Sequence, residues 1–141
     1  MRALMKLGLF MPIIVLVAVL ATGGRVVAHP TALAIDATAD LNSPSRTTAA
    51  VTGTIVCGSL EDATITVKIF QSVGRLLNIG LGTVAVDCTG VSQVWAASVV
   101  AIPGLKFQPG PATVVVEAAT SVATVPDSGS MLIGAKLNLT P

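Results

Sequence analysis

The feature that most constrains the fold of this chain is an alternation of apolar and polar residues with a period of two. Ile65, Val67 and Ile69, for example, fall on one face of an extended segment, and polar residues separate them. Val, Ile and Thr are stiff at their first side-chain torsion and fit a pleated surface. The pattern predicts seven strands, at 31–38, 47–57, 63–72, 76–88, 93–101, 112–120 and 131–139.

Turn-forming residues separate these runs, as at Asn42-Ser43-Pro44 and Pro126-Asp127-Ser128-Gly129. Seven short strands in a domain of this length predict an all-β fold, namely an antiparallel immunoglobulin-like β-sandwich. A small closed barrel is the alternative. Within the run 76–88 the apolar phase changes near Gly80 and Gly82, which predicts a bulge or bend there.

The first 28 residues have the order of a secretory signal peptide. Arg2 and Lys6 precede a charge-free apolar run of about 15 residues, and Val26-Val27-Ala28 is small at its first and third positions. A membrane-spanning helix needs about 20 residues. We therefore expect cleavage between Ala28 and His29, a secreted domain over 29–141, and no membrane contact after cleavage. An uncleaved N-terminal anchor is the alternative.

The charges of the expected mature domain are few and balanced. It carries five Lys and Arg side chains against seven Asp and Glu, a difference of −2. Nothing in this composition resembles a basic phosphate-binding face, so nucleic acid is not an expected partner.

Two cysteines, Cys57 and Cys88, both fall in the exported part. An isolated pair in an oxidising compartment usually forms a disulfide. Closing a loop of this length would stabilise the fold by about 3–4 kcal/mol. Redox and metal roles are the alternatives, but the spacing is not C-x-x-C and two cysteines are too few for a zinc site.

Five short motifs resemble a family of small secreted bacterial domains of unknown function that are common in actinobacteria. In chain order they are Cys57-Gly58, Gly74-Arg75, Val86-Asp87-Cys88-Thr89-Gly90, Trp95-x-Ala97-x-Val99 and Phe107-Gln108-Pro109-Gly110-Pro111-Ala112. The resemblance covers Arg46 to Leu139. It implies an immunoglobulin-like sandwich with Cys57 and Cys88 bridged, and it implies no activity. A weaker similarity, to secreted sandwiches that carry enediyne chromophores, implies small-ligand carriage.

The mature part has three aromatic residues, Trp95, Phe70 and Phe107. Trp95 is interpreted as a core residue near the bridge, as in immunoglobulin domains. The alternative is an exposed platform that stacks on sugar, with Phe70 and Phe107 as its only possible companions. Phe70 shares its phase with Thr64, Thr66 and Lys68, which favours an exposed position.

The usual acid–base constellations of enzymes are missing from the sequence. His29 is the one histidine, at the expected mature terminus, where an imidazole is hard to hold as a general base. Glu61-Asp62 is interpreted as a solvated pair in a turn rather than as glycosidase carboxylates. An N-terminal His29 could bind copper, but a second histidine is lacking. We expect no enzyme activity, no cofactor and no metal site.

The sequence thus predicts a secreted, non-catalytic module that interacts with a protein or a cell surface, through a partner that the residues do not identify. A small-molecule or carbohydrate binding module is the alternative, with Trp95, Phe70 and Phe107 as its candidate ligand-binding residues. The weakly charged Thr- and Ser-rich surface fits the first of these functions, in which an exposed strand edge would pair with the partner.

Overall fold

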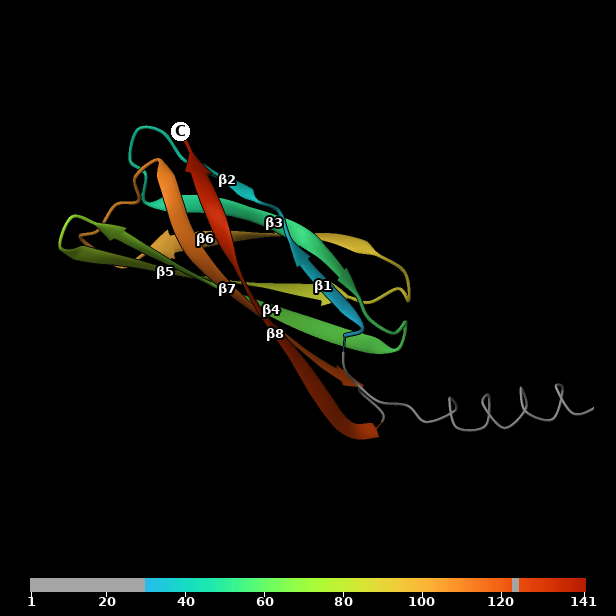
Figure 1. The fold of residues 1–141 in the computed structure, drawn as a ribbon. Helices are drawn as coiled ribbons and strands as arrows, with labels where there is room; N and C mark the ends of the chain where they lie inside the picture. Colours follow the sequence, from blue (N-terminus) through green and yellow to red (C-terminus); the bar gives the residue numbers. More distant parts are fainter. Residues whose placement is uncertain (1–29, 123–124) are drawn as a thin grey trace, which may run out of the picture.

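The computed structural model describes residues 30–122 and 125–141, which form eight strands (Figure 1). The predicted signal peptide and the Ala28–His29 cleavage position lie outside the described residues, as does the candidate copper ligand His29. The strands are β1 (Ala32–Ile35), β2 (Thr38–Leu41), β3 (Thr48–Val56), β4 (Glu61–Val73), β5 (Leu76–Asp87), β6 (Gln93–Ala101), β7 (Gly110–Val122) and β8 (Val125–Thr140). The predicted run 31–38 is divided between β1 and β2.

The strands belong to one sheet that closes on itself. Its order is β1-β3-β2-β8-β7-β4-β5-β6, and β3 also pairs with β6, so that all strands except β1 form a ring. β2 runs parallel to β8, with Thr38 to Asp40 opposite Asn138 to Thr140. The other pairings are antiparallel.

The all-β prediction is confirmed, but the sheet is a mixed closed barrel rather than a purely antiparallel sandwich. The parallel pairing of β2 with β8 makes the sheet mixed. Together with the pairing of β3 with β6, it closes the barrel. A closed sheet has no free strand edge within its ring. Closure therefore removes most of the exposed edges that the sequence analysis expects to pair with a partner.

The interior is filled by the apolar positions that the period of two selects. On β4 and β7 every second residue is buried, so that Ile65, Val67 and Ile69 point into the core beside Val114 and Val116 of the neighbouring strand. Trp95 on β6 and Phe107 in the β6–β7 connection are the largest fully buried side chains.

The disulfide joins Cys57 and Cys88 at one end of the barrel. The amide of Gly90 donates to the carbonyl of Cys57 at 3.0 Å, and the amide of Cys88 donates to the carbonyl of Glu61 at 3.2 Å. We call this the disulfide end. We call the opposite end, where β4 turns into β5 through Gly74 and Arg75, the hairpin end. Gly74 has φ 62°, as the first residue of a tight hairpin turn requires.

β5 has no bulge against β4 near Gly80 and Gly82, so the bulge form of the predicted bulge or bend is wrong, and the bend stays a prediction. Its register with β4 is unbroken from Leu76 to Asp87. The two glycines occupy inward positions because there is no room for a side chain: a Cβ on Gly80 would lie 2.5 Å from the ring of Phe107, and one on Gly82 would lie 2.3 Å from the carbonyl oxygen of Ser98. The alternate residues Leu77, Ile79 and Leu81 therefore point outward.

We expect Gly82→Ala to destabilise the protein by about 1–3 kcal/mol, because the obstructing atoms belong to the β6 backbone and can move only with the strand. Gly134→Ala on β8 is the matched control, since a Cβ there would meet nothing closer than 3.7 Å. Urea unfolding of both variants measures the difference. Equal midpoints for the two variants would contradict the close approach of β5 and β6.

Candidate interaction face

The outward side chains of β5 and their neighbours form an apolar surface on the outside of the barrel. Leu81 lies opposite Lys68 on β4 and Val100 on β6, and Ile79 lies opposite Phe70 on β4. The amide of Ile102 donates to the carbonyl of Ile79 at 2.9 Å, which continues the surface past the end of β6. The apolar outer face, as we call it, consists of Phe70, Leu77, Ile79, Leu81, Val100 and Ile102.

Most of this apolar outer face is open to solvent. The exposed fractions of Leu81 and Val100 are 52% and 53%, Leu77 and Ile102 are similarly exposed, and Phe70 and Ile79 are half-buried. A hollow of about 310 Å³ lies at its centre, bordered by Lys68 and by five of the six apolar residues. A contiguous exposed apolar surface on a soluble domain is typical of an interaction site.

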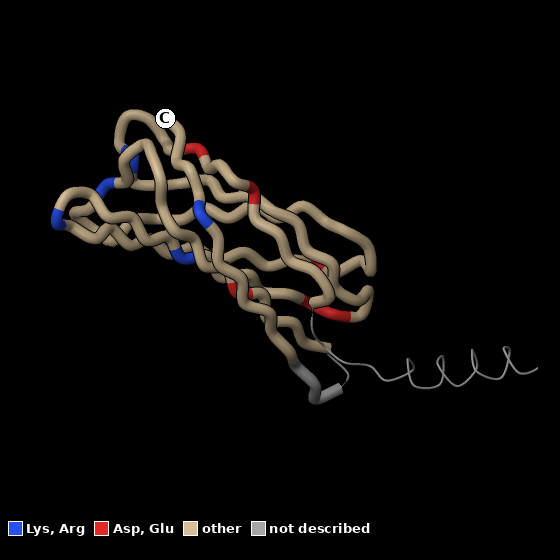
Figure 2. Tube along the Cα trace, viewed as in Figure 1, with Lys and Arg blue, Asp and Glu red and all other residues tan. Residues whose placement is uncertain are grey.

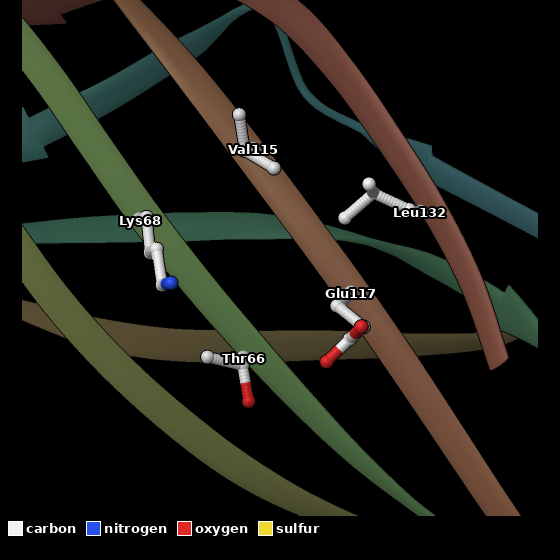
Figure 3. A pocket seen from close by; sticks show the side chains of 5 residues that line it. All are labelled: Thr66, Lys68, Val115, Glu117 and Leu132. Atoms are coloured by element: carbon white, nitrogen blue, oxygen red, sulfur yellow. The ribbon is translucent and has the colours of Figure 1, made fainter.

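Two further hollows adjoin the apolar outer face. One is shared by Phe70 and Leu77 with Lys136 of β8. The other lies across β4 and β7, where Thr66, Lys68, Val115, Glu117 and Leu132 line it (Figure 3). Lys68 thus lies between the apolar hollow and the polar one, at the border of the face.

Buried amide side chains fix the β6–β7 connection beside the face. Gln71 Nε2 donates to the backbone carbonyl of Gln108 at 2.7 Å, and the backbone amide of Gln108 donates to Gln71 Oε1 at 2.9 Å. Asn78 Nδ2 donates to the carbonyl of Lys106 at 2.6 Å. Sequence reasoning missed this role, although a polar residue in the inward phase of β4, as Gln71 is, signals a buried hydrogen bond.

The charged side chains are unevenly distributed along the barrel. Lys and Arg gather toward the hairpin end, and most Asp and Glu lie toward the disulfide end (Figure 2). Arg75 is in the β4–β5 turn and Lys106 is in the β6–β7 connection, both at the hairpin end. Asp62 and Asp87 are direct cross-strand partners at the disulfide end.

The structure separates the three aromatic residues that sequence analysis grouped. Trp95 is 2% exposed and Phe107 is fully buried, so neither ring is available to stack on a sugar at the surface. Their burial contradicts the alternative of an aromatic binding platform and agrees with the core interpretation of Trp95. Phe70 points outward, as its phase predicts, and it lines two of the hollows.

Glu61 and Asp62 point to opposite sides of β4 and do not form a solvated pair. Glu61 is buried, and its Oε1 accepts the Gly58 amide at 2.6 Å, so that it braces the β3–β4 turn beside the disulfide. Asp62 is exposed. Within residues 30–122 and 125–141, no group of three or more His, Cys, Asp or Glu side chains is placed to hold a metal ion. The same residues contain no helix long and apolar enough to cross a membrane.

Comparison with known proteins identifies no family. No family model matches the chain, and no curated protein matches it either. Among solved structures, the chain is similar to AggA, the major subunit of aggregative adherence fimbriae type I from Escherichia coli, with a TM-score of 0.44 and 13% sequence identity. The match covers 77% of this chain and 93% of AggA.

Proposed function

We propose that this protein is a secreted, non-catalytic β-barrel module that attaches to a cell surface through its apolar outer face. The observation that supports this function most is the composition of that face. The outward positions of β5 nearest the hairpin end are Leu77, Ile79 and Leu81. Further along the same strand the outward positions include Thr83 and Asp87, which are polar, as expected for a surface in contact with water.

The outward residues Leu77, Ile79 and Leu81 are not part of the core, whereas Val84 and Val86 of the same strand pack against it. Beside the three outward residues, the inward positions are Asn78, Gly80 and Gly82, and Phe107 and Val99 fill the core next to Gly80. Exposed leucines add nothing to folding that polar residues would not, and they carry a risk of aggregation. A function in binding explains their presence.

Secretion is part of the same proposal. The disulfide is of the kind that persists outside the reducing cytosol, and residues 1–28 have the order of a signal peptide. The resemblance to small secreted actinobacterial domains points in the same direction and stays a prediction.

The experiment is retention of the purified protein on washed cells of the organism that encodes it. We expect Leu81→Asn to reduce the retained fraction by about tenfold or more, because burying one leucine contributes about 1.5–3 kcal/mol and 1.4 kcal/mol corresponds to a factor of ten. Val94→Asn is the matched control, since Val94 is 77% exposed on the same barrel but near the disulfide end. Equal retention of the wild type and the Leu81 variant would overturn the proposal.

A second candidate function, carriage of a small apolar molecule, is favoured by one observation. Phe70 borders two adjoining hollows, and the apolar one has a volume within the range of ligand sites. The two candidates separate in the retention experiment, because a ligand carrier has no reason to sediment with cells.

A further inference from the structure

Cations lie beside the apolar outer face on its hairpin side. Lys68 borders the apolar hollow. Arg75 is exposed in the β4–β5 turn, and Lys106 is exposed in the connection that Asn78 fixes through its hydrogen bond to the Lys106 carbonyl. The face therefore combines apolar side chains with positive charge on one side of the molecule.

The hairpin end itself is apolar at its tip. Leu76 is 65% exposed immediately after the turn, Leu77 follows it, and Val73 precedes the turn. The β4–β5 hairpin forms one extremity of the molecule (Figure 1). A protruding turn with two leucines and an arginine is suited to entering a boundary between water and an apolar phase.

The opposite end of the barrel has the opposite charge. Asp62 and Asp87 lie side by side there, and Figure 2 shows the separation of the two signs of charge along the molecule. Such a charge distribution orients a protein in the field of a negative surface with its basic end forward.

We propose that the surface to which this protein attaches is an anionic lipid bilayer, and that the hairpin end makes the contact. Leu76 and Leu77 enter the headgroup region, and Arg75, Lys106 and Lys68 interact with lipid phosphates. This inference rests on the proposed function, since it names the partner of the same face. It replaces the sequence-based expectation of no membrane contact after signal cleavage, because binding at the interface needs no spanning segment.

Charge also argues against a second copy of the chain as the occupant. A two-fold contact through the apolar outer face would place the same surface of both copies together. Such a contact would bring two sets of Lys68, Arg75 and Lys106 to one interface, where like charges repel. Phosphate headgroups instead supply negative charge next to Arg75 and Lys106, whereas Lys68 already shares a hollow with Glu117 (Figure 3).

The test is sedimentation of the purified mature protein, residues 29–141, with lipid vesicles. The probes are vesicles of phosphatidylglycerol mixed with phosphatidylcholine, and vesicles of phosphatidylcholine alone. We expect binding to the anionic vesicles that weakens as salt is raised. Leu76→Ser combined with Leu77→Ser should reduce the affinity by more than about tenfold. Arg75→Gln combined with Lys106→Gln should reduce it by about tenfold or more, at about 1 kcal/mol for each charge.

The matched control combines Leu60→Ser with Val91→Ser, which removes from the disulfide end two apolar side chains at least as exposed as Leu76 and Leu77. This variant should bind anionic vesicles as the wild type does. Any of three results would overturn the inference. They are an equal loss of vesicle affinity in both double-serine variants, equal binding of the wild type to the two kinds of vesicle, and no binding of the wild type to either. Retention on cells together with no vesicle binding would overturn it while leaving the proposed function in place, with an acidic protein or polysaccharide as the partner.

Discussion

Replacing Trp95 by alanine is expected to reduce the free energy of unfolding by about 3–5 kcal/mol, the range for deleting a large aromatic side chain from a core. The indole ring lies against Gly53, its cross-strand neighbour on β3, where a Cβ would approach the ring to 2.6 Å. A smaller side chain leaves a cavity that the paired strands β3 and β6 cannot close. Urea unfolding followed by circular dichroism measures the loss.

Trp95→Phe is the control for this prediction. The indole Nε1 has no hydrogen-bond partner among the described residues, so phenylalanine removes volume without breaking a hydrogen bond and should cost less than alanine. An exposed, sugar-stacking tryptophan would behave differently, because surface substitutions usually change stability by no more than about 0.5 kcal/mol. A loss that small in Trp95→Ala would show that the residue is not in the core.

Removing the disulfide is expected to have the second largest effect. Cys57→Ala combined with Cys88→Ala should destabilise the protein by about 3–4 kcal/mol, because the cross-link closes a loop with a sequence separation of 31 residues and limits the unfolded chain. Urea unfolding again measures the loss. Reduction of the wild type with dithiothreitol should shift its unfolding midpoint as far as the double substitution does. An unchanged midpoint in the double variant would contradict a stabilising bridge.

Much of the fold could be predicted from local pattern. The period of two on β4 correctly assigned Ile65, Val67 and Ile69 to the core and Phe70 to the outside. It also placed β6 at its observed bounds. These elements were predictable because the strand period depends only on which residues avoid water.

The arrangement of the strands could not be predicted from the sequence pattern, because it depends on contacts between residues that are distant in the chain. The parallel pairing of Thr38 to Asp40 with Asn138 to Thr140 joins segments about a hundred residues apart, and nothing in either segment signals the partner. Without that pairing, the same strands fit an antiparallel sandwich as well as a barrel.

The candidate face was missed for a related reason. The rule that apolar residues of a strand face the core would turn Leu77, Ile79 and Leu81 inward. Val84 and Val86 are in the other phase, so the rule requires a bulge or bend near Gly80 and Gly82 to turn them inward as well. Phe107 and the backbone of Ser98 instead occupy the space beneath Gly80 and Gly82. Volume supplied by distant residues thus reverses the orientation of β5 and exposes its leucines.

Side-chain footprinting of the cell-bound protein tests the central claim, that attachment occurs through the apolar outer face, most directly. Carbene labelling followed by mass spectrometry compares each residue in the free and the bound protein. We expect that binding protects Leu77, Leu81, Val100 and Ile102 from labelling. The labelling of Leu60, Val91 and Val94, near the disulfide end, should stay unchanged. Protection confined to the disulfide end, with the four face residues labelled as in the free protein, would contradict it.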